Sequence, residues 1–281
     1  MKTMKKKLFL MLAVACAACL SLALLAGCSS DDSSKDEPAA SEETKTLVVG
    51  FDNSYPPYGY IGDDGEDTGF DIELAREVAN RLGWNVETRA IDWDAKDAEL
   101  NQGTITCIWN GFTQEGREDD YTFSEPYMLN EQVIVTKAGS GIESLEDLAD
   151  KAVITQVDSA ALDVLEGEDM ADVVATFKDG QVQQISDYNN AFMQLESGQV
   201  DAVACDLSIA AYQMANNPDV YVMLEEPLSS EHYAVGFKKG DDETAQQVTD
   251  ALREMYADGF VEELVEKYSD QGITIENWVL K

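Results

Sequence analysis

The stretch Ile108-Trp109-Asn110-Gly111-Phe112-Thr113, followed by Arg117, is the part of the sequence that decides the fold. Residues 104–109 predict a short buried strand, and Asn110-Gly111 predicts a turn because both residues tolerate positive φ. Ligands of open α/β sheets bind beyond the carboxyl ends of the strands. Thr113 and Arg117 therefore predict a carboxylate site, since a guanidinium meets a carboxylate with two hydrogen bonds. A loop arginine paired with an acidic neighbour is the alternative.

The first 27 residues predict a secretory signal, because four lysines precede an apolar run at residues 8–26. The end of this run, Leu25-Ala26-Gly27-Cys28, resembles the lipobox of bacterial lipoproteins. The resemblance implies cleavage before Cys28 and lipid attachment to its thiol. An uncleaved membrane anchor is the alternative, since the run approaches spanning length. Residues 28–45 are rich in Ser, Asp, Glu and Ala, which is typical of a flexible tether.

Acidic residues dominate the chain, with 55 Asp and Glu against 19 Lys and Arg and a formal net charge of −36. Removing the signal, which holds four of the lysines and no acid, lowers the charge to −40. Such a charge excludes nucleic acid as a partner and disfavours direct adhesion to anionic lipid. A lipid anchor would then be needed to hold the protein at the membrane.

Two cysteines, Cys107 and Cys205, lie outside the signal and the anchor. Both fall in apolar runs, where a free cysteine usually behaves as a small buried hydrophobe. We expect no disulfide between them, because the two runs belong to different lobes. With a single histidine, His232, they leave little material for a zinc site. The sequence therefore predicts no metal and no cofactor.

The alternation of strands and helices predicts an α/β protein with mostly parallel pairing and right-handed crossovers. In the first half, the expected strands are residues 46–51, 86–91 and 104–109, and the expected helices are 71–82 and a short one that ends at 100. A second α/β unit has expected strands at 152–157, 173–177 and 200–205, with helices from 159, at 187–196 and from 207. Two last helices, 244–257 and 261–268, are expected to return to the first unit.

Short local motifs refine this pattern. Asp63-Asp64-Gly65 predicts the tip of a hairpin, because the cluster lacks the ligand spacing of a calcium loop. Ser144 with Asp147 predicts a capping box at the start of a short helix. Extended runs at 131–137 and 233–237 do not fit the strand–helix alternation, so we interpret them as crossovers between two lobes.

The predicted architecture is thus two α/β lobes joined by two extended hinge crossovers. Residues 46–130 and 233–281 form lobe 1, and residues 131–232 form lobe 2. A ligand site is expected in the cleft between them.

Six runs, in this order, resemble the solute-binding proteins of polar amino-acid ABC transporters, bacterial extracellular solute-binding protein family 3. They are LVVGFDNSYPPY at 47–58, GFDIEL at 69–74, GFT at 111–113 with Arg117, FSEPY at 123–127, VDAVACD at 200–206 and AVGFKKG at 234–240. The resemblance implies the two-lobed type II periplasmic-binding fold, which closes on its ligand by hinge motion.

The resemblance also implies a role for each ligand-binding residue. Arg117, supported by Thr113 and Gly111, would bind the α-carboxylate, together with Ser159 and the backbone amides that begin at Ala160. Asp206 would accept the α-ammonium group. The side-chain end would be lined by the aromatic walls Tyr55 and Trp93, by the acid Asp52, and by Gln156.

Several of these residues have an alternative role in the structure alone, without ligand contact. The alternative for Asp206 is to cap the helix that follows it, and the alternative for Trp93 is to be part of the core. We expect core packing for Tyr58 and Trp109. Glu231 and His232 are expected at the hinge or on the surface.

The sequence also departs from the family pattern at two places. Ala160 removes a hydroxyl that many members carry at the start of the second-lobe helix. The segment from Thr113 to Arg117 is one residue shorter than the commonest pattern.

The leading hypothesis is a monomeric, lipid-anchored receptor on the outer face of the cell membrane. It would bind a polar amino acid and deliver it to ABC permease subunits without doing chemistry. Glutamine or a basic amino acid is favoured and cystine remains open, because ionised Asp52 only accepts hydrogen bonds. The alternatives are a dehydratase of the same fold, with an acidic group in the cleft, and a ligand-sensing domain.

Overall fold

The computed structural model describes residues 44–281. The predicted signal, the lipid site at Cys28 and nearly all of the tether lie outside the described residues. Within residues 44–281, no helix is both long enough and apolar enough to cross a membrane.

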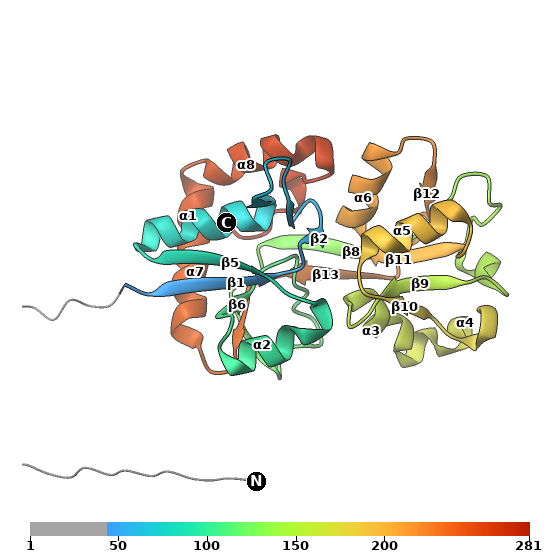
Figure 1. Cartoon of the computed structure of the whole chain (residues 1–281), viewed down its shortest axis with the longest axis horizontal. Helices are drawn as coiled ribbons and strands as arrows, with labels where there is room; N and C mark the ends of the chain where they lie inside the picture. The colour runs from blue at the N-terminus through green and yellow to red at the C-terminus, as the bar shows by residue number, and fades with distance from the viewer. Residues whose placement is uncertain (1–43) are drawn as a thin grey trace, which may run out of the picture. The chain divides into compact units, whose positions relative to one another are not determined.

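The first lobe is built on a five-stranded sheet in the order β5-β1-β6-β14-β7 (Figure 1). Strand β1 pairs in parallel with β5 and β6, whereas β14 pairs antiparallel with β6 and β7. The bounds are β1 Thr46–Phe51, β5 Asn85–Ala90, β6 Cys107–Ile108, β7 Tyr121–Phe123 and β14 Gly236–Lys238. The parallel centre agrees with the predicted crossovers.

The second lobe is built on a sheet in the order β10-β9-β11-β8-β12, with β13 also paired to β8. Its bounds are β8 Met128–Lys137, β9 Val153–Gln156, β10 Gln183–Ile185, β11 Ala202–Asp206, β12 Tyr221–Met223 and β13 Ser229–Tyr233. The crossovers β8 and β13 pair with each other over five residues, antiparallel, and run side by side between the lobes (Figure 1). The predicted hinge is therefore a two-stranded ribbon.

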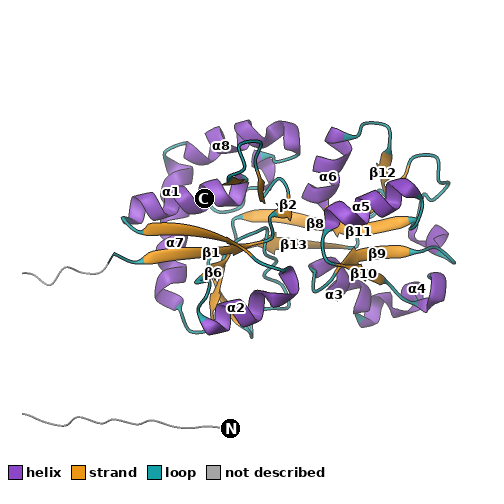
Figure 2. Cartoon of the chain, viewed as in Figure 1, coloured by secondary structure: helices purple, strands orange, loops and turns teal. Residues whose placement is uncertain are grey.

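Helices flank the strands of both lobes (Figure 2). Helices α1, α2, α7 and α8 belong to the first lobe, and α3, α4, α5 and α6 to the second. Their bounds are α1 Phe70–Leu82, α2 Lys96–Gln102, α3 Ala160–Glu166, α4 Ala171–Val174, α5 Tyr188–Ser197, α6 Leu207–Asn216, α7 Asp242–Ala257 and α8 Phe260–Tyr268. The two last helices contact α1, so their predicted return to the first lobe is confirmed.

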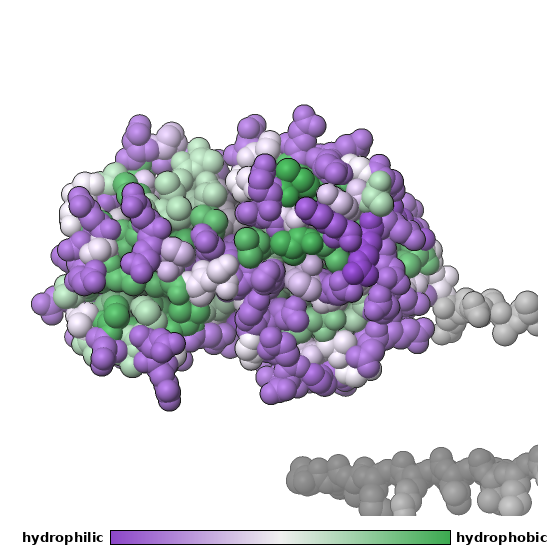
Figure 3. Space-filling model, turned by 180° about the vertical axis from the view of Figure 1, so that it is seen from behind, coloured by the Kyte–Doolittle hydropathy of each residue, from purple (hydrophilic) through white to green (hydrophobic). Residues whose placement is uncertain are grey.

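Short turns of 3₁₀ helix complete the fold. They span Trp93–Ala95, Leu145–Leu148, Glu168–Met170, Lys178–Gly180, Ser269–Gln271 and Ile275–Asn277. The second of these carries the predicted capping box, in which Asp147 accepts hydrogen bonds from the backbone N–H and the hydroxyl of Ser144. Hydrophilic residues cover much of the face seen in Figure 3, as the charge of the chain requires.

One strand prediction was wrong and a second was correct only in part. Residues 173–177, predicted as a strand, lie at the end of α4 and beyond it, and the strand beside β9 is instead β10. Val173 and Val174 belong to this short helix and pack against a cluster of buried apolar residues of the second lobe, which includes Leu165 and Phe177. Their apolar character alone therefore did not indicate a strand. The strand predicted at 104–109 is reduced to β6, although the backbone N–H groups of Thr106 and Trp109 still donate to the carbonyl oxygens of Val48 and Gly50 in β1.

A three-stranded ribbon, β2-β3-β4, lies beside the main sheet of the first lobe. Its strands are β2 Ser54–Tyr55, β3 Gly59–Ile61 and β4 Asp67–Thr68, so the hairpin predicted around Asp64 is confirmed. Gly69 connects this hairpin to α1 with φ of 129°. A Cβ there would lie 2.2 Å from the carbonyl oxygen of Tyr58, so the approach requires glycine.

Asp71, in the first turn of α1, holds the turn that follows β6. Its carboxylate accepts a 2.6 Å hydrogen bond from the backbone N–H of Gly111 and 2.8 Å bonds from the hydroxyl of Tyr127. The side chain is fully buried, and burial raises the pKa of Asp71 to about 7. Asp71 therefore positions the turn at Asn110-Gly111, although nothing in the local sequence predicted a structural role for this acid.

Replacing Gly69 by Ala should destabilise the protein far more than the same change at Gly65. Gly65 also has positive φ, at 84°, but nothing lies within 4 Å of a Cβ there. We expect Gly65→Ala to lower the free energy of unfolding by about 1 kcal/mol, from backbone strain alone. Gly69→Ala adds a backbone clash and should cost more than about 3 kcal/mol in urea unfolding. Equal costs at the two positions would contradict the close approach.

Asp71→Ala should lower the free energy of unfolding by about 2–4 kcal/mol, because it leaves a buried N–H and a buried hydroxyl without acceptors. Asp63→Ala, at the exposed hairpin tip, is the matched control and should stay within about 0.5 kcal/mol of the wild type. Urea unfolding of both variants checks this expectation. A loss for Asp71→Ala no larger than the control would show that the turn after β6 does not depend on Asp71.

Candidate functional site

One small cavity between the lobes collects nearly all the predicted ligand-binding residues. Its volume is about 20 Å³. It is lined by nine predicted residues, Tyr55, Trp93, Gly111, Thr113, Arg117, Gln156, Ser159, Ala160 and Asp206, and by Asn110. These residues come from strands, turns and helix starts of both lobes, so only the tertiary fold brings them together. A space of this size holds about one water molecule, so the lobes would have to move apart to admit an amino acid.

Arg117 supplies the positive charge of the cavity. Its Nη1 donates to the carbonyl oxygen of Thr113 at 3.3 Å, and its Nη2 pairs with Asp163 of α3 at 2.8 Å. The guanidinium carbon also lies 5.1 Å from the centre of the Phe112 ring. These contacts orient the guanidinium and leave other N–H groups free for an anionic ligand, because arginine has five donors. The predicted pairing with an acidic neighbour is therefore present, and the carboxylate clamp stays a prediction.

Asp206, at the end of β11, supplies a negative charge to the cavity wall. Its side chain makes no capping hydrogen bond to α6, which removes the cap interpretation. Instead its Oδ1 accepts from Asn130 at 3.0 Å, Gln132 at 2.7 Å and the hydroxyl of Tyr233 at 2.8 Å. Burial raises the pKa of Asp206 above its ordinary value. Its Oδ2 receives none of these three bonds.

Glu231 belongs to the same buried group, although we expected it at the hinge or on the surface. It lies on the hinge strand β13 and is 3% exposed, so the surface assignment was wrong. Its Oε1 accepts from Thr113 at 2.9 Å and from Asn130 and Gln132, each at 2.8 Å. Burial, followed by the charge of Asp206, raises the pKa of Glu231 to about 7. Thr113 therefore links the predicted carboxylate site to this acid.

Asp52 does not line the cavity. Its Oδ2 accepts a 2.7 Å hydrogen bond from Nε2 of Gln156 in the second lobe, and its Oδ1 accepts from the backbone of Ser54 at 2.8 Å. Burial raises the pKa of Asp52. The acid predicted at the side-chain end therefore contacts Gln156, which does line the cavity.

Contacts between the lobes close the cavity. Nε1 of Trp93 donates to the carbonyl oxygen of Asp158 at 3.0 Å, and Lys96 forms an ion pair with the Asp158 side chain. The ring of Trp93 also packs on Phe112, with ring centres 5.8 Å apart. Trp93 is therefore both a wall of the cavity and part of a small core cluster.

The hydroxyl of Ser159 is already in use. It accepts from the backbone N–H of Leu162 at 3.2 Å as the cap of α3. It also lies 3.2 Å from the hydroxyl of Thr155, which itself donates to a carbonyl oxygen, so Ser159 is the donor of that pair. Contact of Ser159 with a ligand carboxylate stays a prediction.

The remaining expectations, core packing for Tyr58 and Trp109 and free thiols at Cys107 and Cys205, are confirmed.

Asn110 lines the cavity but was treated only as a turn residue. It is 2% exposed, and neither its Oδ1 nor its Nδ2 has a hydrogen-bond partner within the described chain. Buried amides are almost always hydrogen-bonded, so this pair of atoms points to a polar ligand. A polar residue directly before the glycine of a strand-end turn was the available sequence signal.

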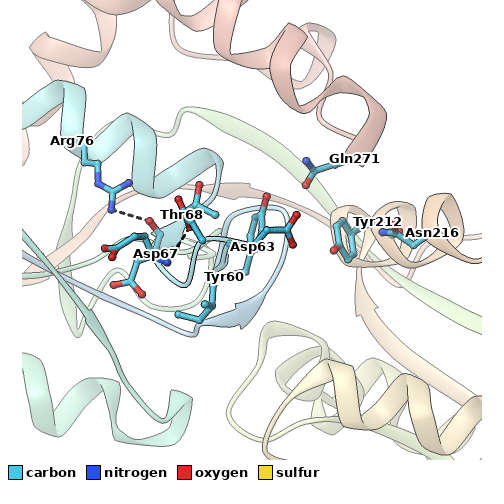
Figure 4. Close-up of a pocket in the computed structure, with 12 residues that line it drawn as sticks. Tyr60, Asp63, Asp67, Thr68, Arg76, Tyr212, Asn216 and Gln271 are labelled. Carbon is cyan, nitrogen blue, oxygen red and sulfur yellow. Dashed lines mark hydrogen bonds between the residues drawn. The ribbon is translucent and has the colours of Figure 1, made fainter.

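A broader hollow lies outside the cleft, between the β3–β4 hairpin, α6 and Gln271 (Figure 4). Its acidic rim is formed by Asp63, Asp64, Glu66 and Asp67. Arg76 donates to the carbonyl oxygen of Asp67 at 2.8 Å on one side, and Tyr212 and Asn216 face it from α6 (Figure 4). Within residues 44–281 no group of His, Cys, Asp and Glu is placed to hold a metal ion.

Comparison with known proteins assigns most of the chain to one family. Residues 47–271 match the model of the bacterial extracellular solute-binding proteins, family 3. The L-cystine-binding protein TcyJ of Escherichia coli (strain K12) is 29% identical, covering 83% of this chain and 86% of its own. The arginine-binding extracellular protein ArtP of Bacillus subtilis (strain 168) is also 29% identical, covering 94% and 98%.

A solved structure supports the fold as well. It is an ABC uptake transporter substrate-binding protein from Streptococcus pneumoniae with bound histidine, 31% identical with a TM-score of 0.78. The match covers 82% of this chain and 94% of that one. The chain therefore belongs to the bacterial extracellular solute-binding proteins of family 3, with the two-lobed type II periplasmic-binding fold.

Proposed function

We propose that this protein is the lipid-anchored receptor of an ABC importer. It captures a polar amino acid in the interlobe cavity and delivers the ligand to membrane permease subunits without chemical change. The observation that carries the proposal is the wall of the cavity, where one guanidinium and one carboxylate face the same small space. These two charges match those of an amino-acid backbone. In a space with little water, each contact contributes more than it would in solution.

Within this proposal, Arg117 binds the α-carboxylate with the help of the backbone at Gly111. Asp206 accepts the α-ammonium group through Oδ2, because its Oδ1 is occupied by three donors. Asn110 supplies the further polar contact that its unpaired amide indicates. Thr113, Ser159 and Ala160 complete the wall around the carboxylate.

The side chain of the ligand is proposed to lie between Tyr55 and Trp93, with Gln156 at its end. Glutamine or a basic amino acid is favoured, and cystine remains open. Gln156 transmits the charge of Asp52, since the two side chains are hydrogen-bonded at 2.7 Å. The relatives bind cystine, arginine and histidine by name, so the family accommodates several polar side chains.

The lobe boundaries that we propose lie within the hinge ribbon. They fall after residue 130 in β8 and after residue 232 in β13, where Glu131 pairs with Ser230 and Leu129 with His232. Closure would rotate the lobes about this ribbon, as in other hinge-closing proteins. The protein would act as a monomer, since one chain supplies every residue of the cavity.

Thermal unfolding of residues 29–281 against each common amino acid and cystine tests the proposal. A ligand that binds only the folded state adds about 2.7 kcal/mol of stability at a hundredfold excess over its Kd. We expect one or two amino acids to raise the unfolding midpoint. Arg117→Ala should weaken their binding by roughly a hundredfold, because it removes a charge-assisted contact.

Arg76→Ala is the matched control, since Arg76 lies at the outer hollow of the same lobe. It should leave the shift unchanged. A shift that survives Arg117→Ala would remove the clamp from the proposal. No shift with any amino acid would exclude the function, and turnover of a prephenate-like acid would favour the dehydratase instead.

Asp52→Asn distinguishes a basic ligand from glutamine. The substitution removes a negative charge but leaves a side chain that hydrogen-bonds to Gln156. A cationic side chain should lose roughly tenfold or more in affinity, whereas a neutral amide should change less than about threefold. Isothermal titration of the identified ligand gives both Kd values. A basic ligand with unchanged affinity would show that Asp52 does not act on the side-chain end.

A further inference from the structure

Asp206 and Glu231, hereafter the acid pair, share the same hydrogen-bond donors. The side-chain nitrogens of Asn130 and Gln132 each donate to Oδ1 of Asp206 and to Oε1 of Glu231, over 2.7–3.0 Å. Two oxygens that share a donor lie less than two hydrogen-bond lengths apart. The two residues are only 5% and 3% exposed, so two acidic groups meet where water screens them little.

Cations from the protein do not neutralise the acid pair. Within residues 44–281, neither acid forms an ion pair with Lys, Arg or His. The nearby Arg117 pairs with Asp163, and His232 pairs with Glu115. The groups that do donate to the acid pair, two amides and the hydroxyls of Thr113 and Tyr233, are neutral. Two carboxylates this close resist ionising together, so one proton is retained more strongly.

We infer that the acid pair holds one proton in the empty cavity and releases it to solvent when an ammonium group binds to Asp206. The inference rests on the proposed function, in which the ligand carries that ammonium group. Before binding, one proton and two carboxyl groups leave a charge of −1. After binding, an ammonium cation and two carboxylates again leave −1. The buried charge is conserved because the cation replaces the proton.

The other groups that face the acid pair do not change charge near neutral pH. They are Tyr55 from β2, Tyr58 from the turn after it, Tyr188 from α5, Tyr233 from β13 and Cys205 from β11. Burial raises the pKa of each of them well above its usual value. Asp71, which holds Gly111, and His232, beside Glu231, are the two further titratable groups that need controls.

The consequence is an affinity that depends on pH with a defined sign. Below the upper pKa of the acid pair, the ligand must displace a proton, so binding weakens as pH falls. Burial and the charge of Asp206 raise the pKa of Glu231 to about 7. Kd should therefore rise as pH falls through this range, by at most tenfold for each pH unit. The ligand ammonium and carboxylate keep their charges over this range.

Isothermal titration of residues 29–281 in buffers of different ionisation enthalpy tests the inference, because the slope of the heat counts the protons exchanged. We expect between zero and one proton released per ligand, with the number rising as pH falls from 8 to 6. Glu231→Gln places an amide of nearly the same size at this position and removes the titrating carboxyl group. In that variant the release and the pH dependence of Kd should both disappear.

His232→Gln and Asp71→Asn serve as controls for the proton count, and both should keep the release. Infrared difference spectra of the wild type add a readout independent of any variant, since ligand should abolish a protonated carboxyl band. Binding without proton release, or release that persists in Glu231→Gln, would overturn the inference and leave the proposed function intact. No binding of any amino acid at any of these pH values would overturn both.

Discussion

The pairing of β8 with β13 is the constraint on which the site depends. These strands are the two connections between the lobes, and their hydrogen bonds bring Asn130, Gln132 and Glu231 beside the end of β11. A paired ribbon bends without loss of its backbone hydrogen bonds, so it can serve as hinge and as support for the site. The residues that orient Asp206 are therefore the residues of the hinge itself.

Burial distinguishes the acids at the cavity from the many acids on the surface of the chain. The surface acids are solvated and screened, whereas Asp206, Glu231 and Asp52 are buried and have raised pKa values. Each of these three acids is surrounded by amides and hydroxyls in place of cations. Such a setting tolerates a negative charge but gains most when a cation arrives. In the proposed function, the ammonium group of the ligand is that cation.

Much of the fold and of the site was readable from local pattern. Apolar periodicity placed α1, α5, α7 and α8 within a few residues, and the hairpin and the capping box followed from turn and cap chemistry. The resemblance placed nine residues that do line one cavity. Failures came where context overrode pattern, as in the apolar residues 173–177, which pack as a short helix and its extension. Asn110 was missed because its turn propensity was a sufficient local explanation.

The sequence by itself determined the class of protein, the order of its elements and the residues that carry charge into the cleft, because these depend on local periodicity and on matching runs. Only the tertiary structure decided which acid faces the ligand space. Asp206 lines the cavity and Asp52 does not, while Glu231, expected at the hinge or surface, is buried beside Asp206. The physical reason is that burial and shared donors arise from contacts between residues up to about a hundred positions apart, which no local pattern encodes.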